Sequence, residues 1–158
     1  MSAIEAKLAA LGVTLPVAAA PVANYVPCVI TGDQLVVSGQ LAFGADGKLA
    51  PEHKGKLGAE VSNDAGRAAA RLCLINVLAQ AKAALGGDLG RIRRCVRLGG
   101  FINAEPDFDA LPQIMNGASD LIVEVLGEAG RHARSTVGVA QLPLSCAVEV
   151  EALFEIER

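Results

Sequence analysis

The C-terminal stretch of the chain alternates apolar and polar residues with the period of a β-strand. Every second residue from 148 to 156 is apolar: Val148, Val150, Ala152, Phe154 and Ile156. The positions between and after them hold Glu149, Glu151, Leu153, Glu155 and Glu157. Because neighbouring side chains of a strand point to opposite faces, the pattern predicts a strand that is covered on one side only.

A second alternating run, at 133–139, precedes this strand, and the short loop 142–146 separates the two. We interpret the pair as a β-hairpin that closes the fold. In this interpretation Arg134 stands with the glutamates on the face of the sheet that turns away from the helices. Such charges are either solvated or part of a site.

Apolar residues recur at helical spacing in three places. A short helix is expected at 2–11, where Gly12 ends it. A long helix is expected from about 62 to 85, and another from about 106 to 127. Pro112 must lie in the first turn of the last helix, because a proline in a helix interior costs ~3 kcal/mol.

The other segments predict strands, turns and a linker. Runs rich in β-branched residues at 25–30 and 34–42 flank Gly32-Asp33, which indicates a hairpin. The Ala/Pro-rich stretch 16–21 is expected to be a linker, and the polar stretch 51–58 a surface loop.

One more strand is expected at 93–102. The order is then hairpin, helix, strand, helix and hairpin. This order predicts a single α+β domain over 1–158, with a mixed β-sheet, two helices packed on one face and an N-terminal extension at 1–23. The other face of the sheet is then either exposed to solvent or covered by another subunit. Because the apolar content of the chain is high, we expect an oligomer.

Composition and charge exclude several classes of function. The chain has 158 residues, of which 52% are hydrophobic and 20% charged, and its net charge is −3. Nucleic-acid binding is not expected, because it would need a basic face. The apolar runs are too short to span a bilayer, so no membrane partner is expected. The four cysteines form no CxxC pair, which argues against disulfides and zinc. We therefore expect a reduced, cytoplasmic protein.

Arg134 and Glu149 are the first candidates for a site. An arginine that points inward from a strand needs a carboxylate or phosphate partner. A glutamate in a partly closed pocket can hold a water as general base. Each residue also has an interpretation without a functional role. Arg134 could form an ordinary salt bridge with a neighbouring glutamate, and Glu149 could belong to a solvated strand face.

Ser38-Gly39 and Tyr25 are further candidates. A glycine at a strand end lets a ligand approach the backbone, although a bulge is the commoner reason for it. Tyr25, the only tyrosine, lends a hydroxyl to a site or caps the core. His53 and His132 have no partners at metal-binding spacing, so both are expected at the surface.

Several of these residues together resemble the motifs of the Rid family (the YjgF-like proteins). The C-terminal part carries Ala133-Arg134-Ser135, then Ala140-Gln141-Leu142-Pro143, then Val148-Glu149-Val150-Glu151-Ala152. Val37-Ser38-Gly39-Gln40 is similar to the family's N-terminal motif. The resemblance covers about residues 24–157.

The resemblance implies a chorismate-mutase-like fold and a homotrimer with sheets inside, helices outside and ligand sites in clefts between subunits. It implies hydrolysis of reactive enamines or imines of amino acids, such as 2-aminoacrylate, to 2-oxo acids and ammonia, with no metal or organic cofactor. By the same resemblance Arg134 holds the substrate carboxylate and Glu149 orients the attacking water. Ser38 and Tyr25 line the cleft, and the backbone of Gly39 holds the ligand.

The chain departs from the family in three places. Thr136 stands where active deaminases usually carry a cysteine, and its hydroxyl is expected to contact ligand. The N-terminal helix and the enlarged segment at 51–61 are typical of a longer subgroup. Two alternatives stay open: a non-catalytic trimer that binds small carboxylates, and an endoribonuclease, which the acidic composition disfavours.

Overall fold

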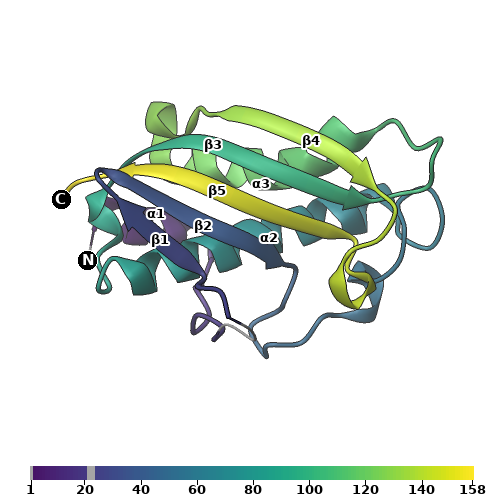
Figure 1. Ribbon diagram of the computed structural model, residues 1–158, viewed down its shortest axis with the longest axis horizontal. Helices are drawn as coiled ribbons and strands as arrows, with labels where there is room; N and C mark the ends of the chain where they lie inside the picture. Colours follow the sequence, from purple (N-terminus) through teal and green to yellow (C-terminus); the bar gives the residue numbers. More distant parts are fainter. Residues whose placement is uncertain (1, 21–23) are drawn as a thin grey trace.

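The computed structural model describes residues 2–20 and 24–158 of the chain. There, five strands form one mixed sheet in the order β1-β2-β5-β3-β4 (Figure 1). The strands are β1 (Cys28–Thr31), β2 (Gln34–Leu41), β3 (Ile92–Asn103), β4 (Ala133–Val139) and β5 (Val148–Ile156). Neighbouring strands are antiparallel except β3 and β4, which are parallel. Within the two described ranges, no helix has the length and apolar character needed to cross a membrane.

The predicted C-terminal hairpin is wrong, because β3 lies between β4 and β5. β4 runs parallel to β3, and α3 (Leu111–Leu126) makes the crossover that parallel neighbours need. The chain then reaches β5 through a 3-10 turn at Pro143–Ser145. The N-terminal hairpin of β1 and β2 is confirmed, with Thr31 paired to Gln34.

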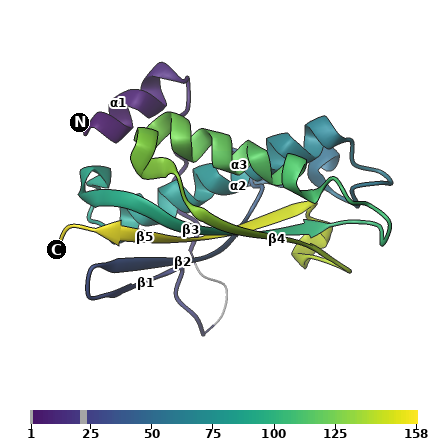
Figure 2. The same ribbon diagram turned by 90° about the horizontal axis from the view of Figure 1, so that it is seen from above.

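Two long helices cover one face of the sheet, as predicted. α2 (Asn63–Ala84) and α3 lie side by side on that face (Figure 2). α3 begins at Leu111 rather than near 106, and Pro112 lies in its first turn. α1 (Ala3–Ala10) lies further out against α3 and begins with a capping box formed by Ser2 and Glu5. The opposite side of the sheet, which we call the open face, carries no helix (Figure 2).

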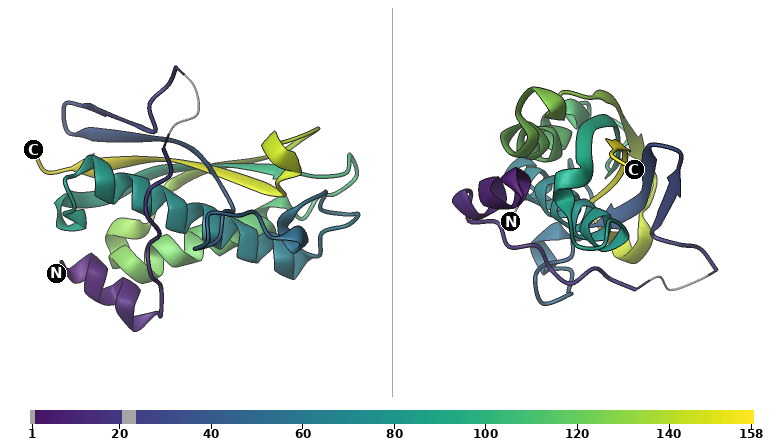
Figure 3. Two further views of the ribbon diagram at one scale, coloured as in Figure 1. Left: turned by 90° about the horizontal axis from the view of Figure 1, so that it is seen from below. Right: turned by 90° about the vertical axis from the view of Figure 1, so that its left-hand side faces the viewer.

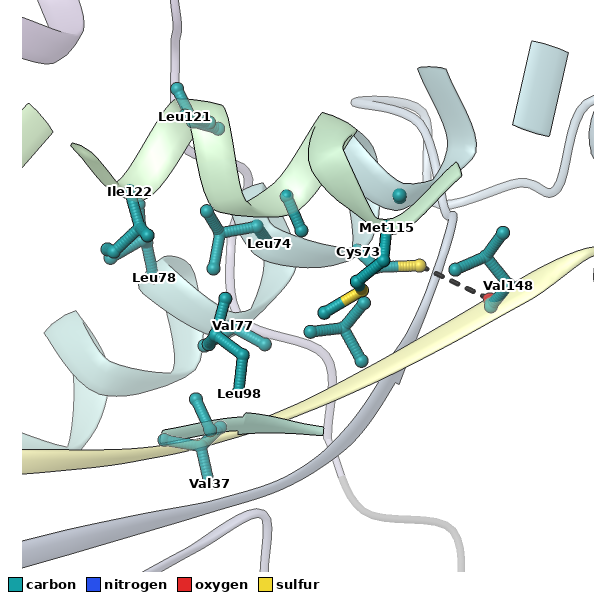
Figure 4. Packing of buried hydrophobic residues seen from close by; sticks show 14 of the residues in the cluster. Val37, Cys73, Leu74, Val77, Leu78, Leu98, Met115, Leu121, Ile122 and Val148 are labelled. Atoms are coloured by element: carbon teal, nitrogen blue, oxygen red, sulfur yellow. Dashed lines mark hydrogen bonds between the residues drawn. The ribbon is translucent and has the colours of Figure 1, made fainter. Parts of the chain in front are cut away.

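The core fills the space between the sheet and the two long helices. The apolar stripe predicted for α3 is buried at Ile114, Met115, Ala118, Leu121, Ile122 and Val125. Figure 4 shows Met115, Leu121 and Ile122, with side chains of α2, packed over the sheet residues Val37 and Leu98. The thiol of Cys73 donates to the carbonyl oxygen of Val148 at 3.2 Å, which joins α2 to β5.

The segment 51–58 is exposed at four of its eight positions, as a surface loop should be, but it also sends two side chains into the interior. It contains a short 3-10 turn at Pro51–His53, the side chain of His53 is 7% exposed, and that of Leu57 is fully buried. The amide of Ala147 donates to the carbonyl of His53 at 2.8 Å, and the amide of Leu57 to that of Asn103 at 2.9 Å. Backbone pairing with the sheet ends therefore holds the segment in place, and the expectation of a surface His53 is wrong.

The two long helices lie backbone to backbone at Gly117. A Cβ atom at this position would fall onto the backbone carbonyl of Arg67 in α2. We therefore expect Gly117→Ala to lower the free energy of unfolding by about 2–3 kcal/mol, although alanine normally favours a helix over glycine. This corresponds to a drop in Tm of about 5–10 °C by calorimetry. Gly138→Ala is the matched control, because a Cβ there meets Leu111 side-chain atoms at 3.6 Å, an ordinary contact. Equal Tm values for the two variants would contradict this packing.

Candidate functional site

The Glu149 side chain stands on the open face directly against Gly39. Glu149 lies in β5 opposite Leu41 of β2 and Phe101 of β3. The register of β2 shifts between Val37 and Gln40, so that Ser38 and Gly39 lie in an irregular stretch. A Cβ atom at position 39 would collide with the Glu149 carboxylate. Glycine is therefore required at 39 for the carboxylate to lie where it does.

A cavity of about 590 Å³ opens beside this carboxylate. It lies beside the part of β2 that is not paired with β1, since the pairing of these two strands ends at Val37. Tyr25, Gly39 and Glu149 all line it. The structure thus brings together three of the site residues named from the sequence, and a volume in this range suits a small-molecule ligand.

Burial raises the pKa of the Glu149 carboxyl above its usual range, and the nearby carboxylate of Glu151 raises it further. Of the described side chains that line the cavity, none belongs to a lysine or an arginine. A carboxyl of raised pKa in a partly closed cavity is a candidate for a group that takes up and releases a proton during a reaction.

Ser38 lies beside the cavity rather than in its lining. Its hydroxyl donates to the carbonyl of Val26 at 3.0 Å, and its amide to that of Pro27 at 2.9 Å. Both bonds fix the segment that leads from Tyr25 into β1. Ser38 therefore holds the tyrosine segment against β2.

Arg134 lies on the helix-facing side of the sheet, so its predicted place on the face with the glutamates is wrong. In β4 it pairs with the buried Leu98 of β3, and its Nη1 donates to Asn116 Oδ1 at 2.8 Å and to Ser119 Oγ at 3.2 Å, both in α3. The error follows from the hairpin, because β4 is oriented by β3 and α3 and not by β5. Within one chain, Arg134 and Glu149 are on opposite faces.

A relay of hydrogen bonds extends from this arginine to the turn after α3. Ser119 Oγ lies 2.8 Å from His132 Nε2, and His132 Nδ1 lies 2.6 Å from the carbonyl oxygen of Gly130. Because that carbonyl only accepts, Nδ1 carries the proton and Nε2 accepts from the serine. His132 is half-buried in this relay, and not the surface residue that was expected.

Thr136 shares the helix-facing side with Arg134. It pairs with Gly100, where an added Cβ would meet the Met115 side chain of α3. Its hydroxyl oxygen is buried and, among the described residues, has no hydrogen-bond partner. The structure therefore separates Thr136, like Arg134, from the cavity at Glu149 of the same chain.

Two amide side chains of α2, those of Asn76 and Gln80, also line the cavity and were not among the predicted site residues. Asn76 Nδ2 donates to the carbonyls of Leu41 at 3.1 Å and Phe43 at 2.9 Å. Gln80 Nε2 donates to the carbonyl of Ala19 at 2.8 Å. Two amides four residues apart, on the apolar side of a helix, are the signal that could have pointed to them.

Comparisons with known proteins agree with this fold. Residues 5–156 match the model of the family described as YjgF/chorismate mutase-like, putative endoribonuclease. Protein TCP17 of Trypanosoma cruzi is 51% identical over 154 residues, which are 97% of this chain and 94% of that protein.

Solved structures give the same result. Atu1372 of Agrobacterium tumefaciens, described as of unknown function, is 50% identical with a TM-score of 0.90, over 98% of this chain and 93% of that one. A putative endoribonuclease of Shewanella oneidensis is 40% identical with a TM-score of 0.91, over 97% and 99%. RidA of Psychrobacter is 27% identical with a TM-score of 0.60, over 89% and 94%. The chain belongs to the YjgF/chorismate mutase-like family, which confirms the resemblance and the α+β fold inferred from the motifs.

Because the pKa of Glu149 is raised, the stability of the folded protein should depend on pH at this residue. Its carboxyl holds its proton more tightly in the folded than in the unfolded state, so ionisation at rising pH costs folding free energy. Glu149→Gln should therefore raise Tm relative to the natural chain above the folded-state pKa. The gain should vanish below the unfolded-state pKa of about 4.3.

The measurement is Tm by calorimetry from pH 4 to 8, with Glu155→Gln as the control because Glu155 is exposed on the same strand. A Tm difference for Glu149→Gln that shrinks as pH rises would contradict the sign of the shift.

Proposed function

We propose that the protein hydrolyses reactive imines, and enamines after their tautomerisation to imines, to 2-oxo acids and ammonia. The observation that supports this most is the Glu149 carboxylate, half-buried beside a cavity and without a lysine or arginine among the described lining side chains. A protonated imine carries a positive charge and N–H donors, which such a carboxylate attracts.

The reaction needs only water and proton transfers at the imine carbon. Water adds to the C=N carbon and gives a carbinolamine, with one water proton passing to Glu149. The C–N bond of the carbinolamine then breaks as Glu149 returns that proton to the nitrogen. As the carbonyl forms, the hydroxyl proton passes to the departing ammonia, which leaves as ammonium, and Glu149 is a carboxylate again. A carboxyl whose pKa is raised toward neutrality serves both steps, and the imine itself is already electrophilic.

The substrate carboxylate requires a cation, and we assign this role to Arg134 of a second copy of the chain. Both described contacts of Arg134 use Nη1, and the guanidinium has five N–H donors in all. β4 is an edge strand, and Val137 on its open face is 46% exposed. In a homotrimer with its sheets inside, the open face is covered, and the β4 edge of one chain, which carries Arg134 on its helix-facing side, would border the cavity of another chain. Thr136 then lies near the same carboxylate.

Two other functions make different demands on these residues. A carboxylate-binding trimer needs Arg134 and leaves Glu149 dispensable. An endoribonuclease, the activity in the description of the family and of the Shewanella relative, needs cations for phosphates. The described lining of the cavity offers a carboxylate and no lysine or arginine, so we favour the imine.

The test generates imino acids in situ with an amino-acid oxidase and follows their disappearance with and without the protein. Glu149→Gln should lower kcat/KM by about 10²- to 10⁴-fold, as the loss of a general acid–base does. Arg134→Ala should lower it by about 10- to 100-fold, through KM, because it removes a charge-assisted contact. Arg131→Ala is the matched control, because Arg131 is exposed and bonds only to Glu128 among the described residues.

Binding without turnover, unchanged by Glu149→Gln, would contradict the proposal and favour the carboxylate-binding protein. Cleavage of RNA that Glu149→Gln leaves intact would favour the ribonuclease. Sedimentation analysis tests the assembly directly, and a monomer at all concentrations would contradict the assignment of Arg134.

A further inference from the structure

The N-terminal segment, residues 2–20, forms one wall of the cavity. The residues of this stretch that line it are Pro16, Val17, Ala19 and Ala20. Figure 3 shows the segment crossing from α1, past α2, to the edge of the sheet near β1 and β2. The wall is therefore made by a stretch that composition alone identified as a linker.

Several contacts on both sides of this wall fix its position. Ile4 and Leu8 of α1 are buried in the core cluster, and Val13 and Leu15 pack against it. The ammonium of Lys82 in α2 lies 2.7 Å from the Glu5 carboxylate, and the hydrogen bond to Lys82 lowers the pKa of Glu5 to about 2. The segment is thus attached to α2 before it reaches the cavity.

At the cavity, a hydrogen bond from Gln80 holds this wall in place. Its side chain is 4% exposed, and its Nε2 donates to the carbonyl of Ala19 at 2.8 Å. A buried amide that bonds to a segment 61 residues earlier in the chain fixes the distance between that segment and α2. The width of the cavity at this end therefore depends on Gln80.

The lining of the cavity combines polar and apolar groups. Besides Glu149 and Tyr25, it includes the apolar side chains of Phe43 and Leu144 and the wall of residues 16–20. Its volume of about 590 Å³ equals that of roughly 20 water molecules in the liquid. An imino acid of three carbons, with six heavy atoms, leaves most of this space empty. Apolar walls around empty space favour a ligand that fills them.

We propose that residues 16–20, held by Gln80, select imino acids with long apolar side chains, such as those derived from leucine or phenylalanine. This inference rests on the proposed function, since it places the imine nitrogen at Glu149 and the side chain against the wall. It assigns a substrate class to the cavity and a specificity role to the N-terminal segment.

Two measurements test it. The first compares kcat/KM for the imino acids made from leucine and from alanine, and we expect a preference of at least about 10-fold for the longer side chain. The second measures binding of the stable products by calorimetry, with 4-methyl-2-oxopentanoate expected to bind at least about 10-fold more tightly than pyruvate. The binding arm needs no catalysis.

Two variants locate the selectivity. Gln80→Leu removes the bond to Ala19, and Gln113→Leu, at an exposed position of α3, is its matched control. If the buried substitution prevents folding, Ala19→Asp puts a charge into the wall at an exposed position, and the adjacent Ala18→Asp, outside the lining, is its control. Each test variant should reduce the preference for the longer ligand over pyruvate to below about 3-fold, because it changes the wall that the longer side chain contacts.

The outcomes separate this inference from the proposed function. Hydrolysis with no side-chain preference would overturn the inference and leave the imine hydrolase standing. Preferential binding of the longer 2-oxo acid without hydrolysis of any imine would support the cavity assignment and overturn the hydrolase. A preference that survives both Gln80→Leu and Ala19→Asp would show that the wall does not select, and would overturn the inference.

Discussion

The central strand β5 is the constraint on which both the fold and the site depend. It pairs with β2 on one side and β3 on the other, and its helix-facing side chains are buried at every second position. Because a strand alternates faces, burying Val148 and Val150 under α2 and α3 necessarily presents Glu149 and Glu151 on the open face. The same residues that fix the register of the sheet therefore fix the position of the carboxylate.

The neighbouring strand determines what that carboxylate meets. Gly39, in the irregular stretch of β2, has no side chain, and the Glu149 carboxylate occupies the space where one would lie. Because β1 pairs with β2 only as far as Val37, the rest of β2 forms an uncovered edge of the sheet. An uncovered edge normally needs a loop or a helix over it. Here the N-terminal segment, bonded to Gln80, lies over this region and encloses a cavity at the same time. Edge protection and ligand selection thus depend on one stretch of chain.

Local pattern predicted much of the fold. The period-two run of β5 and the apolar stripe of α3 identified both elements and their buried faces, and Gly32-Asp33 identified the first hairpin. The pairing of β4 was beyond local pattern, because alternation assigns faces within a strand and does not identify the neighbour. The false hairpin then moved Arg134 to the wrong face. His53 was misplaced for a related reason, since backbone bonds to Ala147 and Asn103, distant in sequence, hold its segment inward.

The site was predictable in part. Residue chemistry and the resemblance together drew attention to Tyr25, Gly39 and Glu149, and the structure places all three at one cavity. The contribution of Gln80 was hidden, because its partner is a backbone carbonyl in a segment without a periodic pattern. Whether Arg134 reaches the cavity depends on a second chain, which no pattern within one chain encodes.

The most direct test of the central claim is a crystal structure of the assembled protein with 4-methyl-2-oxopentanoate, the stable product of the proposed reaction. The carbonyl carbon of the ligand should lie within reach of the Glu149 carboxylate, at about 3 Å or through one water. The isobutyl group should lie against residues 16–20, and the ligand carboxylate on Arg134 of a second copy. A ligand bound away from Glu149, or a carboxylate held by other residues, would contradict the proposed reaction.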